Sequence, residues 1–164
     1  MLIGTATGWR FWCVHETFLD GLMLVSPYYW PEPERNQGVS WPKRRFEARC
    51  YRDAAHWPPV PDCECGVYAF TTASEVLLKA EIHRRCAVWS DRSRQIGPIA
   101  VGRVTLRQVF PYQHAIMAPE LRAATGIIDE LWVLGDGSES AEAERMRSLL
   151  AARYGVPAVV GEPG

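Results

Sequence analysis

The chain has 164 residues, of which 48% are hydrophobic and 23% are charged, and its 18 basic residues nearly balance 19 acidic ones. This length fits one domain, residues 1–164, and the composition is not that of a disordered chain. A formal net charge of −1 excludes a global positive field that would attract nucleic acid or anionic lipid. No stretch approaches the roughly 20 apolar residues of a membrane span, and residues 1–12 lack a secretory pattern, so we expect a cytoplasmic protein with no membrane partner.

The first part of the chain alternates strand patterns with irregular, proline-rich segments. Residues 9–14 and 22–26 are rich in aromatic and branched side chains, which predicts two strands with turn chemistry at Asp20-Gly21 between them. Residues 26–42 contain prolines that prevent a regular helix or a central strand. Strand patterns return at residues 45–51 and at 66–70, on either side of a second irregular loop.

The middle of the chain predicts a helix followed by a pair of strands. Thr72-Ala-Ser-Glu75 has the form of a capping box and predicts a helix to about residue 85, with Val76, Leu77 and Ala80 on its apolar face. Residues 99–106 alternate as a strand does, and Gly102 indicates a bulge or a close backbone approach. Residues 109–117 predict a weaker partner strand, interrupted by a proline.

The last part of the chain predicts a strand, a helix and a short extended segment. Residues 127–134 form the apolar strand, and Ser140 is placed to cap a helix with Met146, Leu149 and Leu150 on its buried stripe. Gly155 ends that helix, and residues 156–160 are extended. Together these elements predict an α+β fold, with a curved, mainly antiparallel sheet, two helices and a zinc-pinned loop.

Sixteen consecutive positions contain four potential metal ligands, Cys50, His56, Cys63 and Cys65. Three thiols and an imidazole are the ligand set of a closed, tetrahedral, structural Zn²⁺ site. An odd number of cysteines without a secretory pattern argues against a disulfide framework. The competing interpretation is that Cys50 and Cys65 are core thiols and that His56 hydrogen-bonds a backbone carbonyl.

This core, read as Cys50…His56-x-Pro58…Cys63-x-Cys65-Gly66-x-Tyr68-Ala69, resembles a family of uncharacterised small proteins from high-GC Gram-positive bacteria and their phages. Those proteins are also similar at the segments that match Gly8-Trp9-Arg10-Phe11-Trp12, Val101-Gly-Arg-Val104 and Tyr154-Gly155-Val156-Pro157. The resemblance spans most of the chain. It implies a shared fold and a shared metal, and it implies no activity.

A zinc-dependent hydrolase or deaminase is the enzymatic alternative. A zinc deaminase needs a His-x-Glu segment and a Pro-Cys-x-x-Cys segment. This chain has His15 directly before Glu16, and one residue rather than two between Cys63 and Cys65. Paired cysteine and histidine residues elsewhere lack an orienting group in the sequence, so no catalytic residue is assigned.

The expected function is a non-catalytic, zinc-stabilised binding or adaptor module whose macromolecular partner is a protein. Aromatic anchors beside basic residues are typical of interfaces. The partner-binding residues expected on this basis are Tyr28, Tyr29, Trp30, Trp41, Lys43, Arg44 and Arg45. A nucleic-acid-binding regulator remains a further alternative, because charge beside stackable rings also suits single strands. It requires the basic run at residues 43–45 to converge on one face with Arg84-Arg85 and with Arg92 and Arg94.

Overall fold

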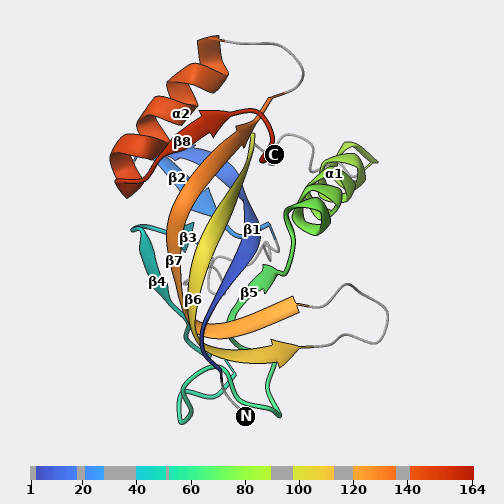
Figure 1. The fold of residues 1–164 in the computed structure, drawn as a ribbon, viewed down its shortest axis with the longest axis vertical. Coiled ribbons are helices and arrows are strands. Elements are labelled where there is room, and N and C mark those ends of the chain that lie inside the picture. Colours follow the sequence, from blue (N-terminus) through green and yellow to red (C-terminus); the bar gives the residue numbers. More distant parts are fainter. Residues whose placement is uncertain are drawn as a thin grey trace.

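The computed structural model describes residues 3–17, 21–27, 40–50, 52–89, 98–112, 120–135 and 141–164. In these residues the strands all belong to one sheet, and two helices pack against it (Figure 1). The elements in chain order are β1 (Ile3–Thr17), β2 (Gly21–Val25), β3 (Ser40–Trp41), β4 (Arg45–Glu47), β5 (Val67–Phe70), α1 (Ala73–Trp89), β6 (Ile99–Tyr112), β7 (Glu120–Leu134), α2 (Ala141–Tyr154) and β8 (Ala158–Val160).

Four of the strands pair in a closed ring. β1 pairs with β6 along most of its length, β6 pairs with β7, and β7 pairs with β5. β5 returns to β1 at one position, where Trp9 lies opposite Phe70. β2 and β3 extend the sheet from β1, while β4 and β8 pair with β7. Every pairing is antiparallel except β7 with β8, so the predicted α+β class with a mainly antiparallel sheet is confirmed.

The long strands β6 and β7 bend because their pairing contains an irregularity. Arg103 pairs with Glu130 and Val104 with Ile128, so Asp129 is an extra residue on β7. The bulge is thus on β7, opposite the step from Arg103 to Val104, and not at Gly102, where the sequence indicated a bulge or a close approach. Gly102 itself allows a close approach, since a Cβ there would lie 2.8 Å from the Trp12 ring.

The main core lies between one face of this bent sheet and α2. Trp12 and Trp41 meet edge to face with ring centroids 5.2 Å apart, and both are buried. α2 lies over one end of the sheet (Figure 1). It adds the buried side chains of Met146, Leu150 and Tyr154 to the core. Apolar burial of this extent is the largest favourable term in the folding of the chain.

α1 covers a second, smaller cluster against β1, β5 and β6. The buried members are Phe11, Phe70, Val76, Ala80, Ile99 and Val101. The predicted capping box is present, because the Glu75 amide donates to Thr72 Oγ1 at 3.3 Å and Glu75 Oε2 accepts from the Thr72 amide at 3.2 Å. The apolar face predicted for this helix is confirmed at Val76 and Ala80.

Several predicted boundaries and partners were wrong. Residues 109–112 of the strand expected at 109–117 are the continuation of β6 to Tyr112, and residues 113–117 lie outside the described residues. The partner of this segment is β7, which begins at Glu120 and is longer than predicted. Leu149 is 42% exposed rather than buried. A helix places residues 146 and 150 on one face and turns residue 149 away from it. No helix in the described ranges is long and apolar enough to cross a membrane.

Candidate metal centre

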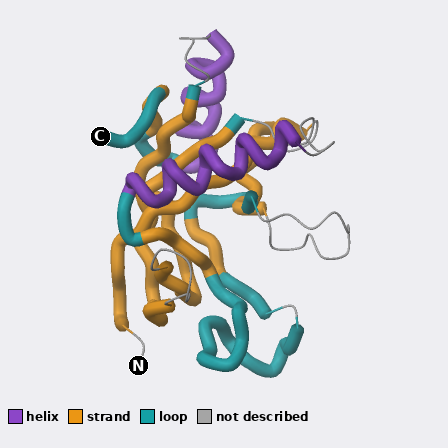
Figure 2. The backbone as a smooth tube through the Cα atoms, turned by 90° about the vertical axis from the view of Figure 1, so that its right-hand side faces the viewer, coloured by secondary structure: helices purple, strands orange, loops and turns teal. Residues whose placement is uncertain are grey.

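The four predicted ligands come together on the loop that joins β4 to β5. This loop projects from one end of the sheet, away from α2 (Figures 1 and 2). One ligand atom from each of Cys50, His56, Cys63 and Cys65 lies within 4.8 Å of the other three, and each residue is partly buried. The cysteines of the cluster are free, so the structure joins none of them in a disulfide. The group is therefore a potential metal site.

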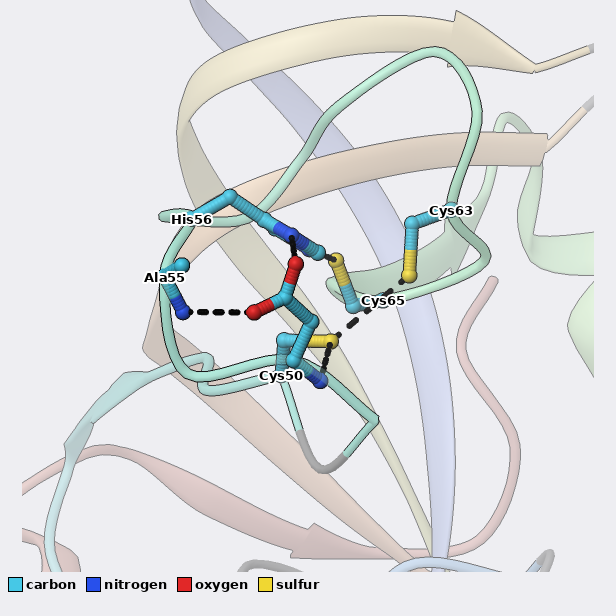
Figure 3. A network of polar contacts seen from close by, with 6 residues as sticks. Cys50, Ala55, His56, Cys63 and Cys65 are labelled. Atoms are coloured by element: carbon cyan, nitrogen blue, oxygen red, sulfur yellow. Dashed lines mark hydrogen bonds and ion pairs between the residues drawn. The ribbon is translucent and has the colours of Figure 1, made fainter.

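The distances between the ligand atoms suit one tetrahedral ion. Cys50 Sγ lies 3.6 Å from Cys63 Sγ, and His56 Nε2 lies 3.2 Å from Cys65 Sγ (Figure 3). Sulfurs about 2.3 Å from a central zinc in tetrahedral geometry are about 3.8 Å apart, and a nitrogen is slightly closer to each sulfur. The spacing is that of donors around a common centre.

Asp53 orients the histidine. His56 Nδ1 lies 3.4 Å from Asp53 Oδ2, while the other ring nitrogen, Nε2, faces Cys65 (Figure 3). Asp53 Oδ1 accepts from the Ala55 amide at 2.8 Å. These two hydrogen bonds, that from Ala55 first, lower the pKa of Asp53. A carboxylate on the distal ring nitrogen fixes the tautomer that presents Nε2 to a metal.

The sulfurs lie in contrasting electrostatic surroundings. Burial raises the pKa of the Cys50 thiol, but the amides of Asp53 and Arg52 and the neighbouring thiols outweigh it and bring the pKa to about 7. At Cys65 burial and the nearby sulfurs of Cys63 and Cys50 act together and raise the pKa to about 12. Three thiolates this close repel one another, and a divalent cation among them removes that repulsion.

Arg122 on β7 fastens the loop to the sheet. Its side chain is 1% exposed, and its guanidinium donates to the carbonyl oxygen of Val60 at 2.9 Å and to that of Cys63. Gly66 lies over its aliphatic part with φ +140, where a Cβ would be 2.6 Å from Arg122 Cγ. Sequence reasoning missed this residue. It gave no signal, because Arg122 precedes the predicted strand at residues 127–134 and lies more than fifty positions from its partners in the chain.

Of the residues expected to bind a partner, the structure describes Trp41, Lys43, Arg44 and Arg45. Tyr28, Tyr29 and Trp30 lie outside the described residues. Trp41 is 1% exposed and stacks on Phe46 with centroids 4.9 Å apart, so its assignment to partner binding is corrected to a core role.

The basic residues near it remain at the surface. Lys43, Arg44 and Arg45 are exposed. Arg44 Nε donates to the Ile128 carbonyl at 2.8 Å, and Arg45 pairs with Glu47 at 2.8 Å. The second basic run, at residues 84–85, is on α1, which Figure 1 shows at the right of the sheet, with β4 at the left. Arg92 and Arg94 lie outside the described residues. The two runs do not converge.

Deaminase chemistry needs a glutamate beside the metal as a proton shuttle, and neither Glu16 nor Glu64, the residue between Cys63 and Cys65, fills that place. Glu16 binds Arg145 of α2 at 2.9 Å, at the end of the molecule away from the loop (Figure 1). The Glu64 side chain is 73% exposed, and its carboxylate lies 3.9 Å from Arg52. Neither carboxylate is placed as a proton shuttle beside the sulfurs.

A cysteine–histidine contact that the sequence did not indicate joins β1 to α1. Cys13 Sγ lies 3.7 Å from His83 Nε2. Burial raises the pKa of the Cys13 thiol to about 11, and burial also lowers the pKa of His83. Both shifts favour the neutral forms, which is the opposite of what a thiolate nucleophile requires. The contact is part of the packing of α1.

The chain matches no protein-family model, and comparisons with curated proteins and with solved structures give no significant match. The resemblance in the cysteine-histidine core stays a prediction.

Proposed function

We propose that this chain is a non-catalytic binding module, stabilised by one Zn²⁺ ion on Cys50, His56, Cys63 and Cys65, whose partner is a protein. The supporting observation is the approach of four ligand atoms to within 4.8 Å on a loop without regular secondary structure. Four protein ligands fill a tetrahedral ion and leave no position for substrate or water. A closed site of this kind suits a structural role better than the hydrolase or deaminase alternative.

Trp57 is the residue on the loop best placed to contact a partner. It follows His56 directly, and 82% of its surface is exposed, while Pro58 and Pro59 beside it are buried. A tryptophan on a rigid support loses little conformational entropy when it enters a pocket, and tryptophan is enriched among interface anchors. The cluster would thus hold the tip of the loop in one shape for recognition.

Metal analysis of the purified protein tests the zinc part of the proposal. We expect about one zinc ion per chain in the parent, marked loss in Cys63→Ser and in Cys65→Ser, and a lower melting temperature after chelation. Cys13→Ala is the matched control, because that thiol lies outside the cluster, and it should keep its zinc. A parent that is folded and free of zinc after preparation with zinc present would contradict the proposal.

A photo-crosslinking amino acid at position 57 tests the partner part. We expect a covalent adduct in cells that protease removes and nuclease does not, and no such adduct from position 149, which is exposed on α2. An adduct removed by nuclease would support the nucleic-acid alternative instead. Equal labelling from the two positions would contradict a partner that recognises the loop.

A further inference from the structure

The cluster also contains two thiols placed to react with each other. Cys50 Sγ and Cys63 Sγ are 3.6 Å apart, and both residues are partly exposed. Cys65 contacts His56 at 3.2 Å and follows Cys63 after one residue, so a Cys63–Cys65 bond would close a very small ring. The thirteen-residue separation of Cys50 and Cys63 allows ordinary disulfide geometry.

We propose that Cys50 and Cys63 are a peroxide-sensitive modification site, at which formation of a disulfide releases the zinc ion and frees the loop. This inference rests on the proposed zinc site and adds its regulation. Oxidation removes two of the four ligands, and the remaining pair, Cys65 and His56, is too few for a structural zinc. Sulfur ligands exposed to solvent are the ones that oxidants reach.

The reaction balances with hydrogen peroxide as the oxidant. The Cys50 sulfur attacks a peroxide oxygen, the O–O bond breaks, and a sulfenic acid forms while the departing hydroxide takes a proton to become water. The Cys63 thiolate then attacks the Cys50 sulfur, the S–S bond forms and the S–O bond breaks, and the departing hydroxide takes a proton from solvent to become the second water. Two thiolates lose two electrons in total, one peroxide becomes two waters, and Zn²⁺ passes to solvent.

β7 anchors the Cys63 side of the reacting pair through Arg122. Arg122 donates to the carbonyl of Cys63 itself, whereas the Cys50 side is joined to β7 two residues earlier, where the Ala48 amide donates to the Ala124 carbonyl. The Cys50 side of the pair is thus the side that moves when the sulfurs close from 3.6 Å to a bond length of about 2.05 Å. Release of zinc would then loosen the segment between His56 and Cys63 that carries Trp57.

The test treats the zinc-loaded parent, freed of reductant, with hydrogen peroxide. Zinc release is followed with a chromogenic chelator, and disulfides are mapped by mass spectrometry of alkylated peptides. We expect one zinc released for each Cys50–Cys63 disulfide, and recovery after dithiothreitol and zinc are added. Cys13→Ala should behave as the parent does.

Cys63→His supplies the matched variant, because histidine keeps a zinc ligand and lacks the second thiol. We expect peroxide to release no zinc from this variant, and a Cys50 sulfenic acid to accumulate that dimedone traps. Zinc retention in the peroxide-treated parent, or a disulfide between other cysteines, would overturn the inference. A parent that binds no zinc yet forms the Cys50–Cys63 disulfide would refute the proposed function and the zinc release together, and leave the disulfide assignment standing.

Discussion

Arg122 links the sheet to the candidate metal centre through hydrogen bonds from its side chain to the loop backbone. A buried guanidinium is costly unless its hydrogen-bond donors are used, and here two of them hold the carbonyls of Val60 and Cys63. These bonds preset the path of the chain into the cluster. Less conformational freedom is then lost when a metal binds.

Arg122→Met should therefore weaken both folding and metal retention. We expect the free energy of unfolding to fall by about 2–4 kcal/mol, because two partly buried carbonyls lose the charged donor of a buried side chain. Zinc should also pass faster to a competing chelator, although every ligand is intact. Arg85→Met, at a side chain 75% exposed on α1, should change the free energy of unfolding by no more than about 0.5 kcal/mol. Equal zinc transfer from the Arg122 variant and the parent would show that the loop does not depend on this anchor.

At the scale of elements, Tyr154 joins α2 to two strands. Its hydroxyl donates to the Trp41 carbonyl of β3 at 2.6 Å and accepts from the Leu24 amide of β2 at 2.9 Å. Both bonds are buried, and the residue stands at the last position of α2. Gly155, with φ +62, then turns the chain toward β8, as a left-handed C-terminal residue does.

Tyr154→Phe should cost about 1–3 kcal/mol of unfolding free energy near neutral pH, because the Leu24 amide and Trp41 carbonyl lose their partner. Burial raises the pKa of Tyr154, and the Leu24 amide and Arg153 offset this only in part. A phenol whose folded pKa is raised contributes fully below its unfolded value of about 10, and its contribution is lost as pH rises through the folded value. The difference in free energy of unfolding between the parent and Tyr154→Phe, measured by denaturant unfolding, should thus become smaller above pH 10.

Tyr68→Phe provides the control, since the Tyr68 hydroxyl donates to the Glu64 carbonyl in an exposed setting. We expect a change of no more than about 1 kcal/mol near neutral pH. A gap between parent and Tyr154→Phe that stays constant from pH 7 to 11 would contradict the buried role assigned to the Tyr154 hydroxyl.

Local patterns in the sequence predicted most elements but not their lengths or partners. The capping box at Thr72 and the glycine at position 155 specify helix ends through contacts a few residues apart. The strand at residues 109–117 was wrong because Pro111 was taken as an interruption, whereas β6 runs through it to pair with β7. Strand pairing is set by contacts between distant segments, which periodicity in one segment does not contain.

In the candidate site, too, the residues that are close in sequence were predicted, and the residue brought in by strand pairing was not. Its four potential ligands were found because they are close in sequence and chemically alike. Arg122 was missed because it reaches the loop only through the β5–β7 pairing, where it lies opposite Tyr68. Trp41 was assigned to a surface because it lies in an aromatic, proline-rich segment, and the pairing of β2 with β3 placed it in the core instead.

At the scale of the whole molecule, a ring of paired strands supports a long loop that has no regular secondary structure. The sheet, α1 and α2 bury apolar clusters of their own, whereas the loop depends on Arg122, two buried prolines and the cysteine-histidine cluster. A loop with so few apolar contacts is a low-stability region unless something joins its ends. One ion on four ligands would supply that link.

X-ray absorption at the zinc edge of the metal-loaded protein tests this account most directly. It should show three sulfur neighbours at about 2.3 Å and one nitrogen at about 2.0–2.1 Å. Cys65→Ser should lose one sulfur neighbour or the metal altogether, while Cys13→Ala should give the spectrum of the parent. A parent spectrum with an oxygen neighbour from water, or with fewer than three sulfurs, would contradict a closed structural site.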